Sequence, residues 1–350
     1  MNTATTTTVT PSSTCPCCGS RQTLLPSPHY TACSLCGHRW RLPLEQASYY
    51  QTLAVARNDV STPWFKRKIG ERVAAVADLL KTGDERVLEI GCAEGELGRE
   101  VKARFAVTYE GVELSQDREL ARQALDRVFA TPASEVEAAP YQLILSFHVL
   151  EHIERPEEEL AAWSRLLGAD GRVLVEVPNQ AGHPLLASDR NIEHLHQFTS
   201  ASLALLLARC GFTCDALSVG HYESPVYSDS IRVVARLQPT VEQREQQLLQ
   251  RFREKTAGPF LVYGIGGDYL NYLAPLAESL DIHALLDSAE AKWGQRLGRH
   301  VITGYDAQAH ADLPIVICSI RFAADIRQHL LDRGIAAQRL IGLDSIYEDA

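Results

Sequence analysis

The chain has 350 residues, 45% of them hydrophobic, and a formal net charge of −10. This length and composition supply ample core for two or three domains. The acidic charge argues against a nucleic-acid partner, because proteins that bind a phosphate backbone carry a clear basic surface. No apolar run reaches the ~18 residues of a transmembrane helix, so we expect no membrane partner either.

Residues 1–14 are rich in threonine and lack both the basic start and the apolar middle of a secretory signal. We expect a disordered tail in this segment. The chain contains nine cysteines, and four of them form two C-x-x-C pairs. Such pairs fit metal binding in a reducing cytoplasm better than a framework of disulfides, so we expect a cytoplasmic protein.

Two C-x-x-C-G knuckles follow the tail with the spacing C-x₂-C-x₁₄-C-x₂-C, and they predict a zinc ribbon over residues 15–42. Each knuckle presents two thiolates to one tetrahedral Zn²⁺, and its glycine permits the tight turn. A closed four-cysteine site leaves no open coordination position for chemistry, which indicates a structural ion. The alternative, a redox pair, would not need two knuckles. The expected ligands are Cys15, Cys18, Cys33 and Cys36.

The first knuckle contains a third cysteine, Cys17, so its register needs an argument. Cys18 precedes Gly19 in the same way that Cys36 precedes Gly37 in the second knuckle. We therefore expect Cys18 to be the ligand and Cys17 to point away from the ion.

The first helix of the next domain is expected around residues 63–82, because Pro63 suits an N-terminal helical turn. Three consecutive basic residues, Lys66, Arg67 and Lys68, lie in it. A cluster this short is typical of a solvated helix face, and we expect it to face water.

Residues 86–95, R-V-L-E-I-G-C-A-E-G, form a short apolar strand that leads into a glycine-rich turn, with a helix opening at Glu94. Glycines remove the Cβ atoms that would keep backbone N–H groups away from a ligand. The spacing G-x-x-x-G-x-x-G, at Gly91, Gly95 and Gly98, differs from the dinucleotide pattern G-x-G-x-x-G. By itself the segment is also compatible with an ordinary strand–turn–helix.

Four downstream segments continue the alternation of strands and helices. Residues 107–115 give a second strand ending at Glu113, and a carboxylate there accepts two hydrogen bonds from a ribose diol in comparable folds. Residues 141–153 read as a buried strand that leads into a loop and a helix. Residues 167–179 read as a helix end, a turn and another strand, and residues 193–212 introduce a further helix.

The 86–95 segment resembles motif I of class I S-adenosylmethionine methyltransferases, which typically reads h-L-E-h-G-C-x-x-G. Residues 193–212 are similar to the late H-x-F-T…L-L…G-F segment of that superfamily. The resemblance implies a class I Rossmann-like α/β domain over residues 43–237, with S-adenosylmethionine bound in its 87–150 half. It places Glu113 on the ribose hydroxyls and the glycine turn against the methionine part. The residues expected at the cofactor are Glu89, Gly91, Cys92, Ala93, Gly95, Glu113, Leu114, Ser115 and Phe147.

Methyl transfer to oxygen or carbon also needs a base that removes a proton, and histidine suits that work near neutral pH. The best candidate is His194, with Glu193 as its partner; His196 and His148 are the alternates. The alternative is that these polar residues only brace the loop before the helix at 200–209.

A rival constellation is His148-x-x-Glu151-His152. Together with a distant third histidine it would form a divalent-metal site, as E-x-x-E-H does in some oxygen methyltransferases. Here, however, a histidine stands where such a motif has its first glutamate.

The strand at 230–236 is expected to close this domain, and the polar, helix-forming stretch 238–257 reads as a linker helix. After Gly258 the α/β pattern restarts. Residues 259–273 give a strand, a glycine turn and a helix; a second strand ends at Asp287, and a later one covers 313–319. We expect a second, smaller Rossmann-like domain over 258–350, and the pattern leaves open whether it is structural or functional.

The order of zinc knuckles, methyltransferase and C-terminal Rossmann-like unit resembles the nucleotide-sugar C-methyltransferase family. Residues 263–272, Y-G-I-G-G-D-Y-L-N-Y, and 287–294, D-S-A-E-A-K-W-G, are similar to that family's Y-G-A…K-G…L-L-N-Y and D-x-x-x-x-K-x-G. The lysine of the first motif is absent, and the knuckles are more closely spaced than in the family. In the family, the segment that corresponds to 191–199 reads Y-x-E-H-x-x-x-F-S, and its Glu-His pair serves proton abstraction beside a ketone. Glu193 and His194 match that pair, whereas Asn191 replaces the tyrosine.

The leading hypothesis is therefore S-adenosylmethionine-dependent methyl transfer to carbon or oxygen of a small molecule, a nucleotide-sugar or natural-product intermediate. A zinc-ribbon RNA methyltransferase is one alternative, and the acidic charge argues against it. A non-enzymatic binding module with a vestigial cofactor pocket is another, and the intact Glu89, Gly91 and Glu113 argue against that. The acceptor, the atom methylated, the need for a catalytic metal and the oligomeric state stay open.

Overall fold

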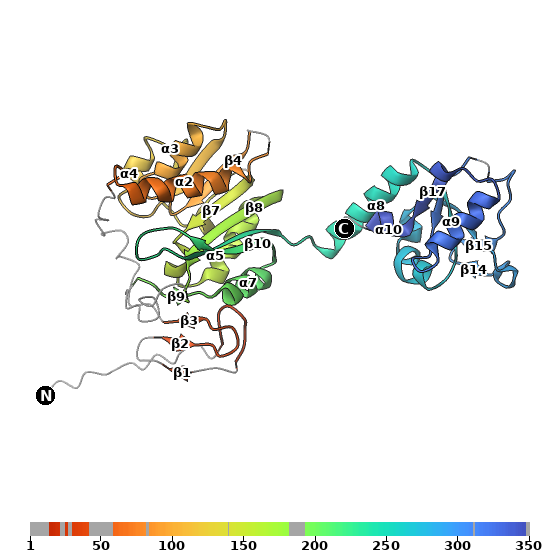
Figure 1. The fold of residues 1–350 in the computed structure, drawn as a ribbon, viewed down its shortest axis with the longest axis horizontal. Coiled ribbons are helices and arrows are strands. Elements are labelled where there is room, and N and C mark those ends of the chain that lie inside the picture. Colours follow the sequence, from red (N-terminus) through yellow and green to blue (C-terminus); the bar gives the residue numbers. More distant parts are fainter. Residues whose placement is uncertain are drawn as a thin grey trace. The chain divides into compact units, whose positions relative to one another are not determined.

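The computed structural model describes residues 14–21, 25–26, 30–41, 59–81, 84–138, 140–181, 193–310 and 312–347, with the backbone alone at 25–26. It divides into two compact units, Met1–Gln238 and Pro239–Ala350 (Figure 1). Residues 1–13 of the expected tail and 42–58, between the ribbon and the first helix, lie outside the described residues.

The first unit is built on a seven-stranded sheet with the order β10-β11-β8-β7-β4-β5-β6. From β8 to β6 the neighbouring strands are parallel, and β11 runs antiparallel between β8 and β10. This topology confirms the expected α/β class. The strands are β4 Arg86–Ile90, β5 Thr108–Val112, β6 Arg127–Phe129, β7 Tyr141–Phe147, β8 Leu167–Pro178, β10 Phe212–His221 and β11 Ser230–Leu237.

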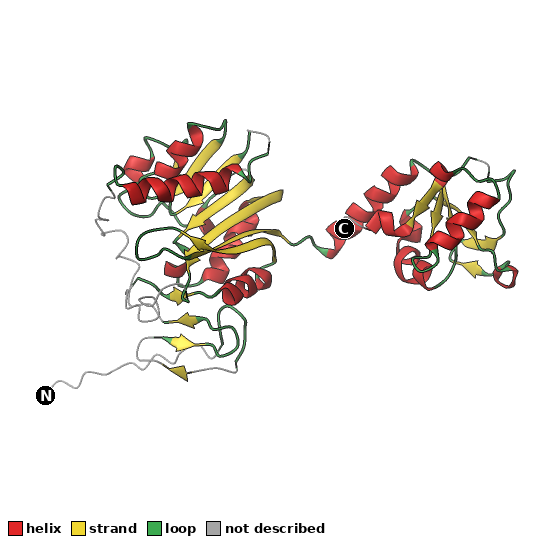
Figure 2. Ribbon diagram, in the orientation of Figure 1, coloured by secondary structure: helices red, strands yellow, loops and turns green. Residues whose placement is uncertain are grey.

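Helices cover both faces of this sheet (Figure 2). Because successive residues of a strand point to opposite faces, Val87 packs in one apolar layer with α2 and α3 while Leu88 packs in another with α5 and α7. The α-helices of the unit are α2 Pro63–Ala77, α3 Glu96–Lys102, α4 Arg118–Ala121, α5 Pro156–Leu166 and α7 Ser200–Arg209, and short 3₁₀ turns cover Ala133–Glu135 and Leu150–His152.

A small second sheet links the cysteine knuckles to the α/β layer, in the order β1-β2-β3-β9. The strands β1 Leu25–Pro26, β2 Thr31–Ala32 and β3 Arg39–Trp40 come from the ribbon, whereas β9 His196–Gln197 comes from the segment before α7. Strand β3 pairs with β9 across about 157 residues of chain, so that Trp40 lies opposite His196. The ribbon is therefore part of the first unit's fold.

The second unit has a six-stranded sheet with the order β14-β15-β13-β12-β16-β17, parallel except for β14. Strands β12, β13 and β16 confirm the strands expected near 259, 282 and 313. Helix α8, which falls on the expected linker, packs its Phe252 against Phe260 of β12 in this unit's core. The elements are α8 Val241–Thr256, β12 Phe260–Tyr263, β13 Ile282–Leu286, β14 Arg296–Leu297, β15 His300–Thr303, β16 Ile315–Ile317, α9 Ala323–Asp332, β17 Leu340–Gly342 and α10 Leu343–Tyr347, with short helical turns at Tyr269–Leu273, Ala274–Ser279, Glu290–Lys292 and Ala337–Arg339. Within the described part of the chain, no helix has the length and apolar character needed to cross a membrane.

Candidate active site

The glycine turn lies between β4 and α3, at the carboxyl end of the central strand of the sheet. Gly91 and Gly95 have φ angles of +71° and +80°, and between them Ala93 has +46°. A Cβ atom at Gly91 would overlap the side chain of Val149, so only glycine fits there without movement of the neighbouring loop. The turn thus exposes backbone N–H groups at the edge of the sheet where ligands of open α/β folds bind.

Glu113 follows β5 and lies beside this turn. Its Oε2 accepts a hydrogen bond from the backbone N–H of Ala93 (2.9 Å), and its Oε1 accepts one from the N–H of Ser115 (2.8 Å). Each carboxylate oxygen has a further lone pair, so both remain able to accept a bond from a ribose hydroxyl. The two backbone bonds fix the carboxylate in place before any ligand binds.

Four of the expected cofactor residues, Glu89, Cys92, Ser115 and Phe147, have buried side chains. Glu89 is 5% exposed and accepts a hydrogen bond from the hydroxyl of Tyr109 (2.9 Å). Burial raises the pKa of the Glu89 carboxyl to about 7, although the Tyr109 bond acts the other way. The side chain of Cys92 packs close above Gly111, and that of Phe147 lies under the Arg72 guanidinium, 4.4 Å from the ring centroid. Leu114, in contrast, is 39% exposed.

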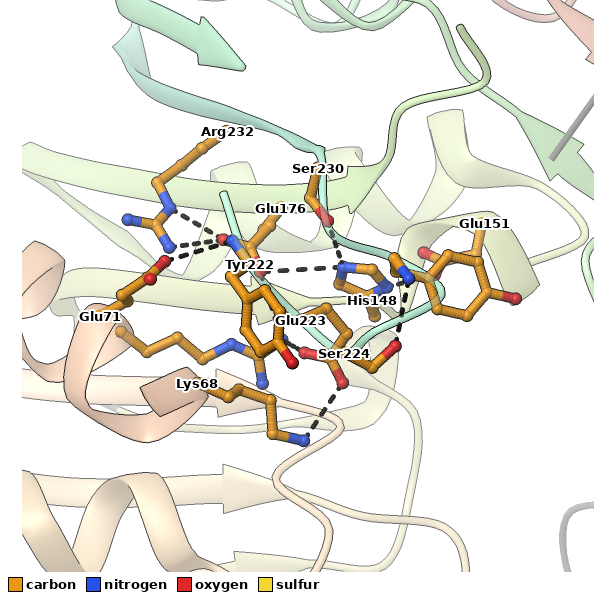
Figure 3. Close-up of polar contacts among 12 residues, drawn as sticks. Lys68, Glu71, His148, Glu151, Glu176, Tyr222, Glu223, Ser224, Ser230 and Arg232 are labelled. Atoms are coloured by element: carbon orange, nitrogen blue, oxygen red, sulfur yellow. Dashed lines mark hydrogen bonds and ion pairs between the residues drawn. The ribbon is translucent and has the colours of Figure 1, made fainter. Parts of the chain in front are cut away.

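Charged side chains gather around Glu176, which lies near the carboxyl end of β8 (Figure 3). Glu176 of β8 is fully buried and binds Arg232 through Nε (2.9 Å) and Nη2 (2.5 Å), and Arg72 through Nη2 (3.2 Å). Glu223, between β10 and β11, pairs with Lys68 (3.1 Å) and with Arg72. Burial acts to raise the pKa of Glu223, but the cations Arg72 and Lys68, together with His148, outweigh it and the pKa is lowered.

Sequence reasoning missed this charged cluster. Lys68 is only 7% exposed, so the expectation that all three basic residues of α2 face water was wrong for this one. The signal was present, because Lys68 and Arg72 share a helical face with the buried residues Phe65 and Val76. A charged Glu176 within the apolar run at 173–178 of β8 was a second signal.

His148 follows β7 with a φ of +56°, and its ring lies between two carboxylates. Its Nε2 lies 2.9 Å from the hydroxyl of Ser230, and its Nδ1 lies 3.5 Å from Oε1 of Glu151. Burial lowers the pKa of His148 to about 4, so its imidazole is neutral near neutral pH.

His194 lies just before β9, and the ribbon fixes its backbone. The Tyr30 hydroxyl donates a hydrogen bond to the carbonyl of His194 (3.0 Å), and the N–H of Arg41 donates to that of Leu195 (3.0 Å). The His194 ring is 5% exposed, with the His152 ring centroid at 4.9 Å and that of Tyr227 at 5.8 Å. Ligand atoms of His194, His152 and Glu151 all lie within 4.8 Å of one another.

His196 has different surroundings from His194. Its Nδ1 lies 3.1 Å from Nε2 of His38 in the ribbon, and its Nε2 lies 3.4 Å from the carbonyl of Glu154. The His196 and His38 rings stack, and burial lowers the pKa of His196 to about 4. Glu193 contributes its backbone carbonyl, which lies 3.0 Å from Nδ1 of His152. Asn191, at the position where the nucleotide-sugar C-methyltransferase family has a tyrosine, lies outside the described residues.

The two cysteine knuckles bring four thiols together. Ligand atoms of Cys15, Cys18, Cys33 and Cys36 lie within 4.8 Å of one another, and Cys17 is not in this group. The donor set and spacing fit one tetrahedral Zn²⁺. The knuckles also dock on both ends of α7: Thr199 donates to the carbonyl of Cys36 (2.8 Å), and Arg209 donates to those of Pro16 (2.8 Å) and Cys17 (3.1 Å).

Comparison with known proteins yields one family. Residues 64–217 match the model of the methyltransferase domain family. No curated protein matches the sequence. Three solved structures illustrate the similarity in fold, and none of them is close enough to carry an argument on activity.

The first is a 1,6-didemethyltoxoflavin N1-methyltransferase from Burkholderia thailandensis, with 22% identity, 50% of this chain and 80% of that chain covered, and a TM-score of 0.41. A magnesium protoporphyrin IX methyltransferase from Synechocystis has 16% identity, coverage of 49% and 81%, and a TM-score of 0.40. An S-adenosylmethionine-dependent methyltransferase from Methanosarcina mazei has 15% identity, coverage of 47% and 97%, and a TM-score of 0.41.

The family model covers the part of the first unit that contains the glycine turn, Glu113 and most of the strands of the central sheet. These residues form the features that the sequence pattern led us to expect of a methyl-donor site. Residues 64–217 therefore form a methyltransferase domain.

Proposed function

We propose that the enzyme methylates a small-molecule acceptor, a nucleotide sugar or a related natural-product intermediate, at carbon or oxygen. The observation that carries the donor side is the glycine turn joined to Glu113 through the Ala93 N–H. A pre-positioned carboxylate and exposed backbone N–H groups suit a ligand with a ribose diol and an amino-acid part. A Cβ at Gly91 would overlap the side chain of Val149, so this turn requires glycine.

The acceptor side is proposed to lie at the carboxyl edge of β7 and β8, where His148 and His194 are found. Methyl transfer is an in-line displacement at a sulfonium carbon, so the protein mainly aligns the two reactants. In the carbon version, His194 removes the proton beside a keto group, and the resulting enolate attacks the methyl group. In the oxygen version, His194 removes the proton of a hydroxyl.

The nucleotide-sugar class rests on the resemblance of the C-terminal unit. Its D-x-x-x-x-K-x-G motif forms a local brace, since Lys292 Nζ donates to Asp287 Oδ2 (2.7 Å) and to the carbonyl of Ile265 (2.7 Å). Asp287 also accepts from the N–H of Ile265 (2.8 Å), which ties the end of β13 to the glycine turn after β12. The four ribbon cysteines are proposed to hold one structural Zn²⁺.

The donor site is tested by calorimetric titration of S-adenosylmethionine into the wild type and Glu113→Ala. Loss of two hydrogen bonds to a charged group should weaken binding by about 2–4 kcal/mol. Glu119→Ala is the matched control, because Glu119 is a nearby exposed carboxylate on α4. Unchanged affinity in Glu113→Ala would remove the assignment, and transfer of labelled methyl to a panel of nucleotide-linked keto sugars tests the acceptor class.

A further inference from the structure

Glu151 is a buried acidic residue to which the proposed reaction gives no role. It lies in the short turn Leu150–His152 after β7 and is 1% exposed. Neither of its carboxyl oxygens has a hydrogen-bond partner among the described residues. Burial of an unsatisfied carboxyl group costs folding free energy, so this group calls for a partner that the chain alone does not supply.

Two histidine side chains lie close to this carboxyl group. Nε2 of His152 is 3.7 Å from Oε1 of Glu151, and ligand atoms of Glu151, His152 and His194 all lie within 4.8 Å of one another. In a tetrahedral zinc site, bonds of about 2.0–2.2 Å place neighbouring ligand atoms about 3.3–3.6 Å apart. The 3.7 Å separation therefore needs only a small closure for both groups to hold one ion.

His148, the first histidine of the constellation that the sequence suggested, belongs to a different group. Its Nδ1 lies 3.5 Å from Oε1 of Glu151, but its ring shares a possible ligand set with Glu176 and Glu223. Those two carboxylates are already paired with arginine and lysine side chains, which would repel an added cation. Glu151 has no lysine or arginine ion pair among the described residues, so a cation is favoured on its side.

The carbonyl of Glu193 fixes the orientation of the His152 ring. It lies 3.0 Å from Nδ1 of His152, and because a carbonyl only accepts, Nδ1 carries the hydrogen. In the neutral ring, the lone pair is then on Nε2, on the side of Glu151. Histidines that bind a metal commonly donate their second N–H to a carbonyl in this way. The N–H of Leu195 also donates to the carbonyl of Glu151 (2.9 Å), which ties the segment of His194 to this turn.

The donor set selects the kind of ion. Two imidazole nitrogens and one carboxylate oxygen suit Zn²⁺, Co²⁺ or Ni²⁺, whereas Mg²⁺ and Ca²⁺ prefer oxygen ligands. Three protein ligands leave a fourth position to water, unlike the closed four-cysteine set of the ribbon. The His152 side chain is 21% exposed, which gives an ion a path from solvent.

We infer that Glu151, His152 and His194 form a second metal site, which takes one divalent cation such as Zn²⁺ or Co²⁺, and that an ion bound there inhibits methyl transfer. The inhibition rests on the proposed role of His194 as the base. A neutral imidazole has one lone pair, so a ring coordinated to the ion has none left for the proton of the acceptor. The ion and that proton therefore compete for His194.

The site is tested by titration of Co²⁺ at pH 8 into the full-length chain, after one equivalent of Zn²⁺ has been added for the ribbon. Burial raises the pKa of the Glu151 carboxyl to about 7, so the carboxylate is mostly ionised at pH 8. The visible absorption should report one equivalent of Co²⁺ on nitrogen and oxygen ligands, without the cobalt–thiolate absorption that exchange at the ribbon would produce. Loss of an outer-shell partner alone weakens metal binding by about 10–100-fold, so loss of a ligand in Glu151→Gln or His152→Asn should weaken it by more than about 100-fold.

His148→Asn is the matched control for metal binding. His148 is about as close to Glu151 as His152 is, but it lies outside the three-residue group, so this variant should keep the equivalent of Co²⁺. Circular dichroism of each variant establishes that it is folded. The initial rate of methyl transfer in the wild type should fall as the Co²⁺ site fills, whereas the rate of Glu151→Gln should not respond to Co²⁺.

Three outcomes would overturn the inference. The first is the absence of this equivalent of Co²⁺ in the wild type, or its persistence in both Glu151→Gln and His152→Asn. The second is its loss in His148→Asn with retention in His194→Asn, which would move the third ligand to His148. The third is an unchanged rate in the wild type with the site filled. Because metal binding is measured without turnover, it separates failure of the site from failure of the proposed methyl transfer.

Discussion

At the level of single residues, two glutamates from neighbouring strands differ in burial, and their expected roles differ accordingly. Glu113 lies at the end of β5, holds two backbone N–H groups and keeps free lone pairs at the edge of the sheet. Glu89, within β4, is 5% exposed and satisfied by Tyr109. We propose that the first meets the ligand, whereas the second makes the stability of the domain depend on pH.

Glu89 should make the wild type less stable as pH rises from about 4.5 to 7. Burial raises its folded-state pKa to about 7 from 4.5, so between these values the folded state binds more protons than the unfolded state. The cost of ionisation is complete above pH 7 and on the order of 3 kcal/mol. The free energy of unfolding of Glu89→Gln minus that of the wild type, measured with urea, should therefore be larger at pH 8 than at pH 4.5 by this amount.

The Glu151 carboxyl also makes the wild type less stable as pH rises, because burial raises its pKa as well. The effect of Glu89 is therefore taken from the difference in unfolding free energy between Glu89→Gln and the wild type at each pH. A difference that is constant from pH 4.5 to 8 would show that the Glu89 carboxyl does not titrate in this window.

His194→Ala should lower kcat by about 10²–10⁴-fold while leaving the affinity for S-adenosylmethionine nearly unchanged. The affinity should be kept because the His194 ring packs against His152 and Tyr227, and the glycine turn at 91–95 belongs to another segment of the chain. His148→Ala and His196→Ala, assayed with the same acceptor, are the comparisons. Near-normal turnover in His194→Ala with an inactive His148→Ala would move the base to His148.

At the level of elements, the ribbon acts as a support for the segment that contains His194. Strand β3 pairs with β9, Tyr30 binds the His194 carbonyl, and the knuckles dock on both ends of α7. With the proposed Zn²⁺ on its four cysteines, a module this small would depend on that ion for folding. Release of the ion should therefore loosen β9 as well as the ribbon.

Cys18→Ser should abolish binding of one Zn²⁺ per chain, whereas Cys17→Ser should keep it, as measured by elemental analysis. The basis is that Cys18 shares the four-thiol cluster with Cys15, Cys33 and Cys36. Amide hydrogen exchange should rise at 193–198 in Cys18→Ser and stay near wild type in Cys17→Ser. Loss of zinc in Cys17→Ser with retention in Cys18→Ser would reverse the register.

Local signals in the sequence predicted the strand–turn–helix around Gly91, the acidic residue at the end of β5 and the cysteine knuckles. Each depends on a few adjacent residues whose backbone or ligand requirements are visible in the pattern. The pairing of Arg39 with Gln197 and the contact of Arg72 with Glu176 were not predictable in the same way. They join residues more than 100 positions apart, and no local propensity encodes which distant partner will lie opposite.

The surroundings of His152 and His194 illustrate the same limit within the site. The sequence does not show that the Glu193 carbonyl lies 3.0 Å from Nδ1 of His152 or that the Glu151 carboxylate lies near the same ring. The 3₁₀ turn after β7 and the start of β9 come together only once the sheet has formed.

At the level of the whole molecule, each unit has its own apolar core. The clusters built on β4, β7 and β8 contain residues of the first unit alone, and those built on β12, β13 and β16 contain residues of the second alone. Helix α8 belongs to the second of these cores, since Phe252 is fully buried against Phe260 and lies near Tyr347. The stability of each unit should accordingly respond to its own core.

Phe252→Ala should destabilise the second unit by about 3–5 kcal/mol, because it leaves a cavity between α8 and β12. Leu206→Ala, in the fully buried face of α7, is the matched control for the first unit. S-adenosylmethionine at 100 times its Kd should stabilise the ligand-binding unit by about 2.7 kcal/mol, as measured by calorimetry of the full chain. The ligand-sensitive transition should shift in Leu206→Ala and stay in place in Phe252→Ala. A ligand-sensitive transition that moves in Phe252→Ala would show that helix α8 stabilises the methyltransferase domain itself.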